Sequence, residues 1–253
     1  MEHAGRHALV TGGGTGIGLD IARALAGAGA QVTITGRTME RLEAVAAQTP
    51  GLYPLRMDVG DEASVRDGIA SAAATRGPVA ICVANAGIAE GAPYRKETLD
   101  HWRQIMTTNL DGVFLTFQAA LATLERDDWG RMIAISSIAG LVGLKNAVAY
   151  TASKHGVIGL VHGLSEEYMG GQITFNAICP GYVETPIVER NAAEIAARQG
   201  ISIDEARAYL AKGNRHRTLL DVDEVTGAAM WLCSNAARSV NGQSIQIAGG
   251  QMV

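Results

Sequence analysis

The stretch Thr11-Gly12-Gly13-Gly14-Thr15-Gly16-Ile17-Gly18 decides the fold of this chain. It follows a short apolar run, residues 7–11, that is typical of a strand, and it opens a segment with apolar residues at helical spacing. Glycine suits this turn because the turn is tight, the backbone must approach a diphosphate, and the helix must pack closely on its strand. The start of the helix then offers free N–H groups to phosphates. The stretch therefore predicts a strand–turn–helix unit that binds a dinucleotide.

The same alternation of strand and helix runs through most of the chain. Strands are predicted at residues 7–11, 31–35, 52–57, 79–84, 131–136, 173–178 and 244–247. Helices are predicted near residues 16–29, 39–48, 62–75, 99–125, 149–169 and 221–234. The runs at 81–84 and 132–135 are apolar on both faces, as in a parallel sheet covered on each side. We expect one α/β domain, 1–253: a Rossmann-type, doubly wound parallel sheet of about seven strands with helices on both faces.

One segment, residues 180–220, breaks this alternation. A connection of this length in a compact domain usually has structure or a function of its own. Residues 192–199 and 204–212 look helical. Ligands of such sheets bind at the carboxyl ends of the strands. We therefore expect a small helical insert, about 186–215, that lies over the active site as a substrate lid.

Composition excludes several classes of function. The net charge is −4, and no basic run is present, so nucleic acid and anionic membranes are not expected partners. No long apolar run or apolar signal core is found, and we expect a cytoplasmic protein. The three cysteines lie far apart without metal-ligand spacing, and the six histidines show none either, so no metal is predicted.

The end of the second predicted strand indicates which dinucleotide binds. An acidic residue there would bond the adenosine ribose of NAD, but the chain has Gly36 and Arg37. A guanidinium at this position can pair with a 2′-phosphate, so NADP(H) is favoured over NAD(H). The alternative is that Arg37 is a solvated loop residue. Thr15 occupies the place in the glycine loop where a second basic residue would support NADP(H).

Three side chains suggest acid–base chemistry. Tyr150 and Lys154 are four residues apart, which places them on one face of a helix. A nearby ammonium would favour the phenolate and thereby lower the tyrosine pKa. Ser137 follows a predicted strand at its carboxyl end, where its hydroxyl could polarise a carbonyl oxygen. In isolation, a tyrosine and a lysine at this spacing would more often be a pair on a helix surface. The glycine loop in the same chain favours a catalytic site instead.

With these motifs in place, the chain resembles the short-chain dehydrogenases/reductases over essentially its whole length. The motifs occur in the family's order. They are the glycine loop, Asp58-Val59, Asn85-Ala86-Gly87, Asn109, the pair Ser137 and Tyr150 thirteen residues apart, Lys154, and Pro180-Gly181 with Thr185. The thirteen-residue spacing selects Ser137 rather than Ser136.

The resemblance implies an oxidoreductase that moves a hydride between a nicotinamide and a ketone or secondary alcohol. Tyr150 would exchange the proton, Lys154 would lower the tyrosine pKa and hold the nicotinamide ribose, and Ser137 would orient the carbonyl. Asn109 would support a water that links Lys154 to solvent. The residues implied for the cofactor are Gly12, Gly14, Thr15, Gly16, Ile17, Gly18, Arg37, Asp58, Val59, Asn85, Ala86, Gly87, Tyr150, Lys154, Pro180, Gly181, Val183 and Thr185.

The family also implies a homotetramer, built partly through the predicted helices 99–125 and 149–169. Apolar residues on more than one face of the second helix are typical of a buried interface helix. These residues are Val157, Ile158, Leu160, Val161 and Leu164.

The expected pocket walls are small or apolar, which favours a hydrophobic ketone as substrate. They are Ala89, Ile138, Ala139, Val142 and Tyr182. The chain is similar to 3-oxoacyl reductases, polyketide ketoreductases and 3-hydroxybutyrate dehydrogenases. In the last group a Gln, a His and a Lys hold the carboxylate, and the matching positions here are Ala89, Ala139 and Ala147, which argues against a small free hydroxy acid.

A 3-oxoacyl thioester is one candidate substrate, with a basic group of the insert meeting the carrier phosphates. These basic residues are Arg190, Arg198, Arg215, His216 and Arg217. The alternative is that they lie on a solvated helical surface and bind no phosphate. Two other functions stand beside the NADP(H)-dependent reductase. One is an NAD-dependent catabolic alcohol or 3-hydroxy acid dehydrogenase, and the other is an NADP(H)-binding redox sensor without turnover.

Overall fold

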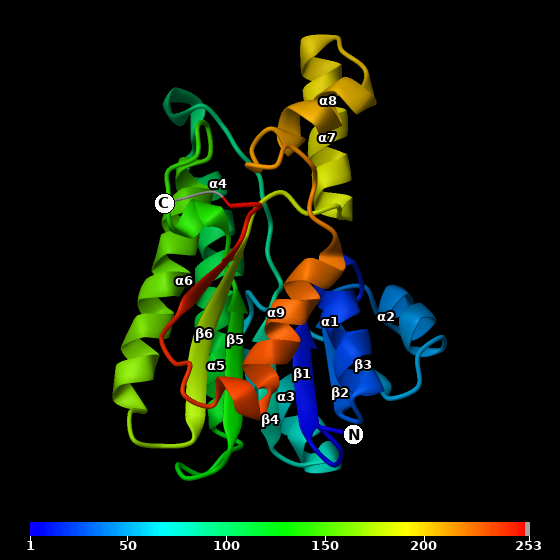
Figure 1. Cartoon of the computed structure of the whole chain (residues 1–253), viewed down its shortest axis with the longest axis vertical. Helices are drawn as coiled ribbons and strands as arrows, with labels where there is room; N and C mark the ends of the chain where they lie inside the picture. The colour runs from blue at the N-terminus through cyan, green and yellow to red at the C-terminus, as the bar shows by residue number, and fades with distance from the viewer. Residues whose placement is uncertain (251–253) are drawn as a thin grey trace.

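Seven parallel strands form one sheet in the order β3-β2-β1-β4-β5-β6-β7. The computed structural model describes residues 1–250 (Figure 1). The strands are β1 (His7–Thr11), β2 (Gln31–Gly36), β3 (Leu52–Arg56), β4 (Val79–Ala84), β5 (Gly130–Ile135), β6 (Ile173–Pro180) and β7 (Ser244–Ile247). This is the predicted doubly wound parallel sheet.

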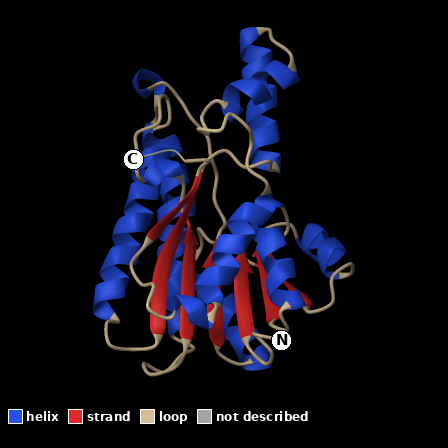
Figure 2. Cartoon of the chain, viewed as in Figure 1, coloured by secondary structure: helices blue, strands red, loops and turns tan. Residues whose placement is uncertain are grey.

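Helices cover both faces of the sheet (Figure 2). On one face, α1 (Gly16–Gly27), α2 (Met39–Ala46) and α9 (Val222–Cys233) contribute residues to one apolar core. On the other, α3 (Glu62–Arg76), α5 (Gly112–Leu121) and α6 (Val148–Glu167) contribute to a second. The strands between these layers are apolar on both faces, and every residue of β1, β5 and β6 is buried.

The predicted helix 99–125 is wrong as a single α-helix. It consists of α4 (Leu99–Met106), a π-helical turn η2 (Thr107–Asp111) and α5. The turn holds the buried Asn109. The helix ends at Leu121 because the hydroxyl of Thr123 donates to Ala120 O at 2.7 Å and accepts from Val79 N at 2.9 Å, which ties the chain to β4.

The insert is more helical than predicted. α7 (Pro186–Gln199) begins six residues before the expected 192–199, with Thr185 as N-cap and proline in the first turn, a start signal that sequence reasoning missed. α8 (Ile203–Ala211) begins at a capping box formed by Ser202 and Glu205. Other ends of helices and strands differ from the prediction by up to two residues. Short 3₁₀ turns complete the chain: η1 (Tyr94–Lys96), η3 (Ile138–Gly140) and η4 (Asn235–Ala237).

The insert stands above the carboxyl ends of the strands, and β1 and β4 lie side by side beneath it (Figure 1). The strand order reverses between β1 and β4, and a ligand crevice forms at such a reversal. α7 and α8 share a small apolar core of their own. Of the helices described in residues 1–250, none has the length and hydropathy to cross a bilayer.

The apolar residues of α6 do not form a free face. Val157, Ile158 and Val161 are buried in the core of their own chain, and Leu160 and Leu164 pack against that core. These residues pack within their own chain and so do not by themselves indicate an intersubunit interface, and the role of this helix in an assembly stays a prediction.

Candidate active site

The glycine loop is shaped by contacts that leave no room for side chains. A Cβ on Gly18 would lie 2.4 Å from Asn85 Nδ2 and 2.6 Å from Gly12 O, and Gly12 has a φ of +64°. α1 then begins at Gly16; its N-cap, Thr15, makes no side-chain capping bond, and its first turn has no acidic residue. The first N–H groups of α1 thus face the loop without a side-chain acceptor, which fits a diphosphate.

Asn85 and Thr11 join the end of β4 to this loop. The amide of Asn85 donates to Thr11 O at 2.9 Å and to Gly12 O at 3.3 Å. The Thr11 hydroxyl accepts from the backbone N–H groups of Asn85 and Ala86, each at 3.0 Å. The side chain of Asn85 therefore fixes the main chain of the glycine loop through hydrogen bonds. Its place in the motif did not specify this role.

Two arginines lie beside the expected ribose site. Arg37 is exposed directly after β2. Arg41, on α2, was missed by sequence reasoning, but its Cγ and Cδ lie 3.5 Å from where a Cβ of Gly14 would be. Within residues 1–250, neither guanidinium has a hydrogen bond or ion pair. The second basic group comes from α2 instead of the glycine loop, because α2 packs its first turns on that loop.

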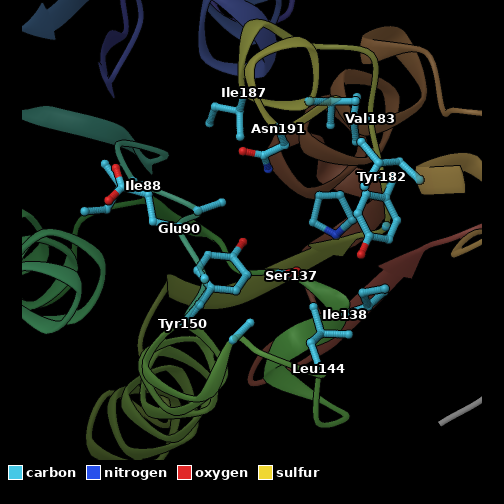
Figure 3. A pocket seen from close by; sticks show the side chains of 18 of the residues that line it. Ile88, Glu90, Ser137, Ile138, Leu144, Tyr150, Tyr182, Val183, Ile187 and Asn191 are labelled. Atoms are coloured by element: carbon cyan, nitrogen blue, oxygen red, sulfur yellow. The ribbon is translucent and has the colours of Figure 1, made fainter. Parts of the chain in front are cut away.

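A cavity of about 480 Å³ opens at the carboxyl ends of β4, β5 and β6. Tyr150 and Ser137 both line it, and Figure 3 shows the Tyr150 hydroxyl directed into the open space, with Ser137 close by. Ser137 accepts a hydrogen bond from Ala139 N at 3.1 Å, which leaves its own proton free to donate. Ser136 instead donates to Lys154 O at 3.1 Å, a structural bond.

The pKa of Tyr150 differs from the prediction. Burial raises the pKa of Tyr150 above that of a free phenol, and only the hydrogen bond with Ser137 lowers it. The Lys154 ammonium lies 5.7 Å from the centre of the Tyr150 ring and donates to Ile135 O at 2.9 Å. In this arrangement the phenol keeps its proton at neutral pH, so Tyr150 is set up as an acid.

Lys154 is buried in the floor of the site. Burial lowers the pKa of Lys154 to about 8. A Cβ on Gly87 would come within 3.7 Å of the ammonium, so this glycine leaves space beside it. Lys154 is therefore a charged group near neutral pH whose charge the interior disfavours.

This burial predicts a pH dependence of stability. The pKa of Lys154 lies near 8 in the folded protein and near 10.5 in the unfolded chain, so the unfolded chain binds the proton more tightly. We expect the free energy of unfolding to rise between those two pH values by up to roughly 3 kcal/mol, relative to Lys154→Met. Urea titrations of both proteins across this window measure the difference. A difference that does not change with pH would contradict a depressed pKa.

Asn109 is a positioning residue in this structure. Its Oδ1 accepts from Ile88 N at 2.8 Å, and its Nδ2 donates to Ile88 O at 2.9 Å and to Ser153 Oγ at 3.2 Å. The amide thus fixes the loop after β4 against α6, the helix that carries the tyrosine. The side chain is thus engaged within the protein, and the water that the resemblance implies at Asn109 stays a prediction.

The remaining predicted cofactor residues occupy two places. At the end of β3, Asp58 accepts from Gly60 N at 3.0 Å, while Val59 is buried against Gly112. After β6, Thr185 lies 3.4 Å from where a Cβ of Gly16 would be, so the start of α7 meets the glycine loop. Four predicted residues line the cavity on this side: Pro180, Gly181, Val183 and Thr185.

Three of the five predicted substrate residues line the cavity: Ala89, Ile138 and Tyr182. Ala139 and Val142 do not. Ala139 turns into the protein and is fully buried, and its N–H donates to Oγ of Ser137, the N-cap of η3. The sequence analysis missed Glu90 and Asn191, which also line the cavity.

It also missed Asn214, a buried amide that clamps the segment after β6. Asn214 accepts from Tyr182 N at 2.9 Å and donates to Tyr182 O and Thr218 O at 2.8 Å each. An asparagine in an insert carries no sequence signal for such a contact.

The basic residues of the insert do not gather at the cavity. Among the five residues proposed to meet carrier phosphates, Arg198 alone lines it. Arg190 faces Glu194 one turn along α7, at 3.9 Å, and Arg215 approaches Gly250 O at 3.5 Å. The helices and turns of the insert point these side chains in different directions. Within the described chain, no group of three or more potential ligands is placed to share a metal ion.

Comparison with known proteins agrees with this geometry. The family model of the short chain dehydrogenases matches residues 6–196. Two relatives from Rhizobium meliloti are a D-beta-hydroxybutyrate dehydrogenase, 32% identical, and an acetoacetyl-CoA reductase, 35% identical. The alignments cover 96% of this chain and 97% of the first relative, and 97% of this chain and 98% of the second. A crystal structure of a variant actinorhodin polyketide ketoreductase with NADPH superposes with a TM-score of 0.92 at 31% identity, covering 97% of this chain and 96% of that one.

Proposed function

Because the chain belongs to the short-chain dehydrogenase family, whose members act on CH–OH groups, we propose that it is an NADP(H)-dependent reductase of neutral, hydrophobic ketones. One observation carries the proposal. The hydroxyl of the half-buried Tyr150 faces the cavity beside Ser137, and burial raises its pKa, so it holds a proton that it can transfer to a carbonyl oxygen.

The residues at the cavity fit the chemistry of carbonyl reduction. A bound nicotinamide dinucleotide would supply the hydride. The free proton of Ser137 can hydrogen-bond the carbonyl oxygen and orient it toward Tyr150. Tyr150 then gives its phenolic proton to that oxygen as charge develops on it. Lys154, fixed by Ile135 O, places a positive charge beside the tyrosine ring and stabilises the phenolate left behind.

The cofactor would lie across the reversal between β1 and β4. The uncapped start of α1 would hold the diphosphate, and Arg37 with Arg41 would flank the adenosine ribose. Two guanidinium groups without partners in the described chain, and the absence of an acidic residue directly after β2, support NADP(H) over NAD(H).

This assignment predicts the effect of two substitutions. Arg37→Ala and Arg41→Ala are each expected to raise the KM for NADPH by about tenfold or more, because each removes a charge-assisted bond to the 2′-phosphate, while the KM for NADH changes by less than about threefold. Initial rates with each cofactor measure the effect. Arg23→Ala, an exposed arginine on α1, is the control. Equal losses with both cofactors would contradict the 2′-phosphate assignment.

The insert is proposed as a substrate lid. Its helices carry several of the residues that line the outer part of the cavity, namely Ile187, Val188, Asn191, Ile195, Tyr209 and Leu210. Most of these are apolar, which supports a hydrophobic substrate. A 3-oxoacyl thioester stays a candidate, but the scattered arginines of the insert give it little support.

The activity is tested directly by nicotinamide absorbance with NADPH and NADH in parallel, against acetoacetate, an acetoacetyl thioester and an aryl methyl ketone. We expect turnover with NADPH on the neutral compounds. Turnover with NADH alone, or oxidation of alcohols without ketone reduction, would instead favour a catabolic dehydrogenase. Cofactor binding without turnover of any of the compounds would favour the redox sensor.

A homotetramer is the assembly that we propose. Phe114 on α5 and Trp231 on α9 are exposed large apolar side chains on two different helices, and they can contact further subunits. Light scattering of the purified protein measures the assembly.

A further inference from the structure

Two acidic side chains, Glu90 and Glu194, line the cavity, and neither the proposed mechanism nor the cofactor uses them. Five charged residues line the cavity: Glu90, Lys145, Lys154, Glu194 and Arg198. Lys145, Glu194 and Arg198 are exposed at its outer rim. Lys154 lies buried beneath the tyrosine. Glu90 is half-buried in the cavity wall. It lies on the same side of the cavity as Ile88 and Tyr150, across from Tyr182 (Figure 3).

Neighbouring residues fix the position of Glu90. Gly91 packs so tightly on the main chain of Asn146 that a Cβ would lie 2.4 Å from its carbonyl oxygen. His101, in the first turn of α4, places its Nε2 3.8 Å from the Glu90 carboxylate. The backbone N–H of His101 donates to the N-cap Thr98 at 3.1 Å, which anchors this turn.

His101 is itself held by a second carboxylate. Its Nδ1 bonds Glu97, whose side chain is 7% exposed. With Nδ1 donating to Glu97, Nε2 can donate to Glu90 only when the imidazole carries both protons. The group Glu90, Glu97 and His101 then has a net charge of −1, and with a neutral imidazole its net charge is −2. In either state this group of three side chains carries a net negative charge.

We infer that Glu90 is a specificity-determining residue that excludes substrates with a free carboxylate next to the reacting ketone. Resting on the proposed function, this inference narrows the substrate class to keto compounds that are uncharged near the carbonyl, such as esters, thioesters and simple ketones. A carboxylate two carbons from the carbonyl would enter the cavity that the Glu90 carboxylate also lines, and like charges repel more strongly in a partly desolvated cavity than in bulk water. An uncharged group in the same place meets no such barrier.

The test compares acetoacetate with methyl acetoacetate, which have the same keto group but differ in charge. We expect the wild-type protein to show a kcat/KM at least about tenfold higher for the ester. Glu90→Gln keeps the size of the side chain and removes its charge, so it should raise kcat/KM for acetoacetate by about tenfold and change that for the ester by less than about twofold. Glu194→Gln, which removes a carboxylate from the exposed rim, is the matched control and should leave the ratio unchanged.

Binding measurements make the test independent of turnover. The affinities of the same two compounds for the NADPH complex of Tyr150→Phe, with and without Glu90→Gln, give the charge preference without any reaction. A wild-type preference for acetoacetate, or a Glu90→Gln variant that changes both compounds equally, would overturn the inference. Failure of the proposed function would look different: no compound would be reduced, while the binding ratio would still respond to Glu90→Gln.

Discussion

Tyr150→Phe is expected to lower kcat for ketone reduction by about 10³-fold or more, because it removes the phenol that faces the cavity beside Ser137. The ring stays, so its packing and the burial of Lys154 are kept. Cofactor affinity should therefore change by less than about threefold. Stopped-flow reduction and fluorescence titration with NADPH measure the two quantities separately.

Two further variants show whether the loss is specific. Ser137→Ala should cost about 10²-fold, since it removes one hydrogen bond to the reacting oxygen and leaves the acid in place. Tyr168→Phe removes a hydroxyl from a tyrosine that packs on Phe175, away from the cavity, and should leave kcat unchanged. A Tyr150→Phe protein with more than a tenth of wild-type activity would remove Tyr150 from its proposed role.

Gly18→Ala is expected to weaken NADPH binding by about 10²-fold or more. The added Cβ would lie 2.4 Å from Asn85 Nδ2 and 2.6 Å from Gly12 O, so either the loop or the end of β4 must move. Such overpacking costs about 1–3 kcal/mol of folding stability in addition. Fluorescence titration gives the affinity, and urea unfolding shows how much of the protein remains folded.

Gly27→Ala is the matched control on the same helix. A Cβ on Gly27 meets nothing within 4 Å, so the substitution should stabilise α1 by up to about 1 kcal/mol and leave NADPH binding unchanged. If Gly18→Ala bound NADPH as tightly as Gly27→Ala, the loop would not be the diphosphate site.

Much of this protein could be predicted from its sequence because the decisive signals are local. The period of apolar residues distinguishes strands from helices, and runs that are apolar on both faces indicate a covered parallel sheet. The glycine loop needs only its place between a strand and a helix. Tyr150 and Lys154 share a helix face through their spacing, and the thirteen-residue spacing within the family pattern selected Ser137, the serine that the structure leaves free to donate.

The tertiary structure decided what depends on burial and on distant contacts. Burial raises the pKa of Tyr150 and lowers that of Lys154, and the ammonium bonds Ile135 O, so burial outweighs the lowering that the sequence led us to expect for the tyrosine. The sequence shows residue types, but the free energy of a charge depends on how much protein surrounds it.

Contacts between residues that are far apart in the sequence could not be predicted either. Asn214 reaches Tyr182 across 32 residues. Arg41 lies on Gly14, and Thr185 meets Gly16, only because the sheet order places those segments together. Glu90 acquires a partner from α4, on the far side of a 3₁₀ turn. Local patterns in the sequence were enough to predict the fold class and the candidate reacting side chains. The charge of these side chains, their partners and the shape of the pocket arise from proximity between segments that no local pattern encodes.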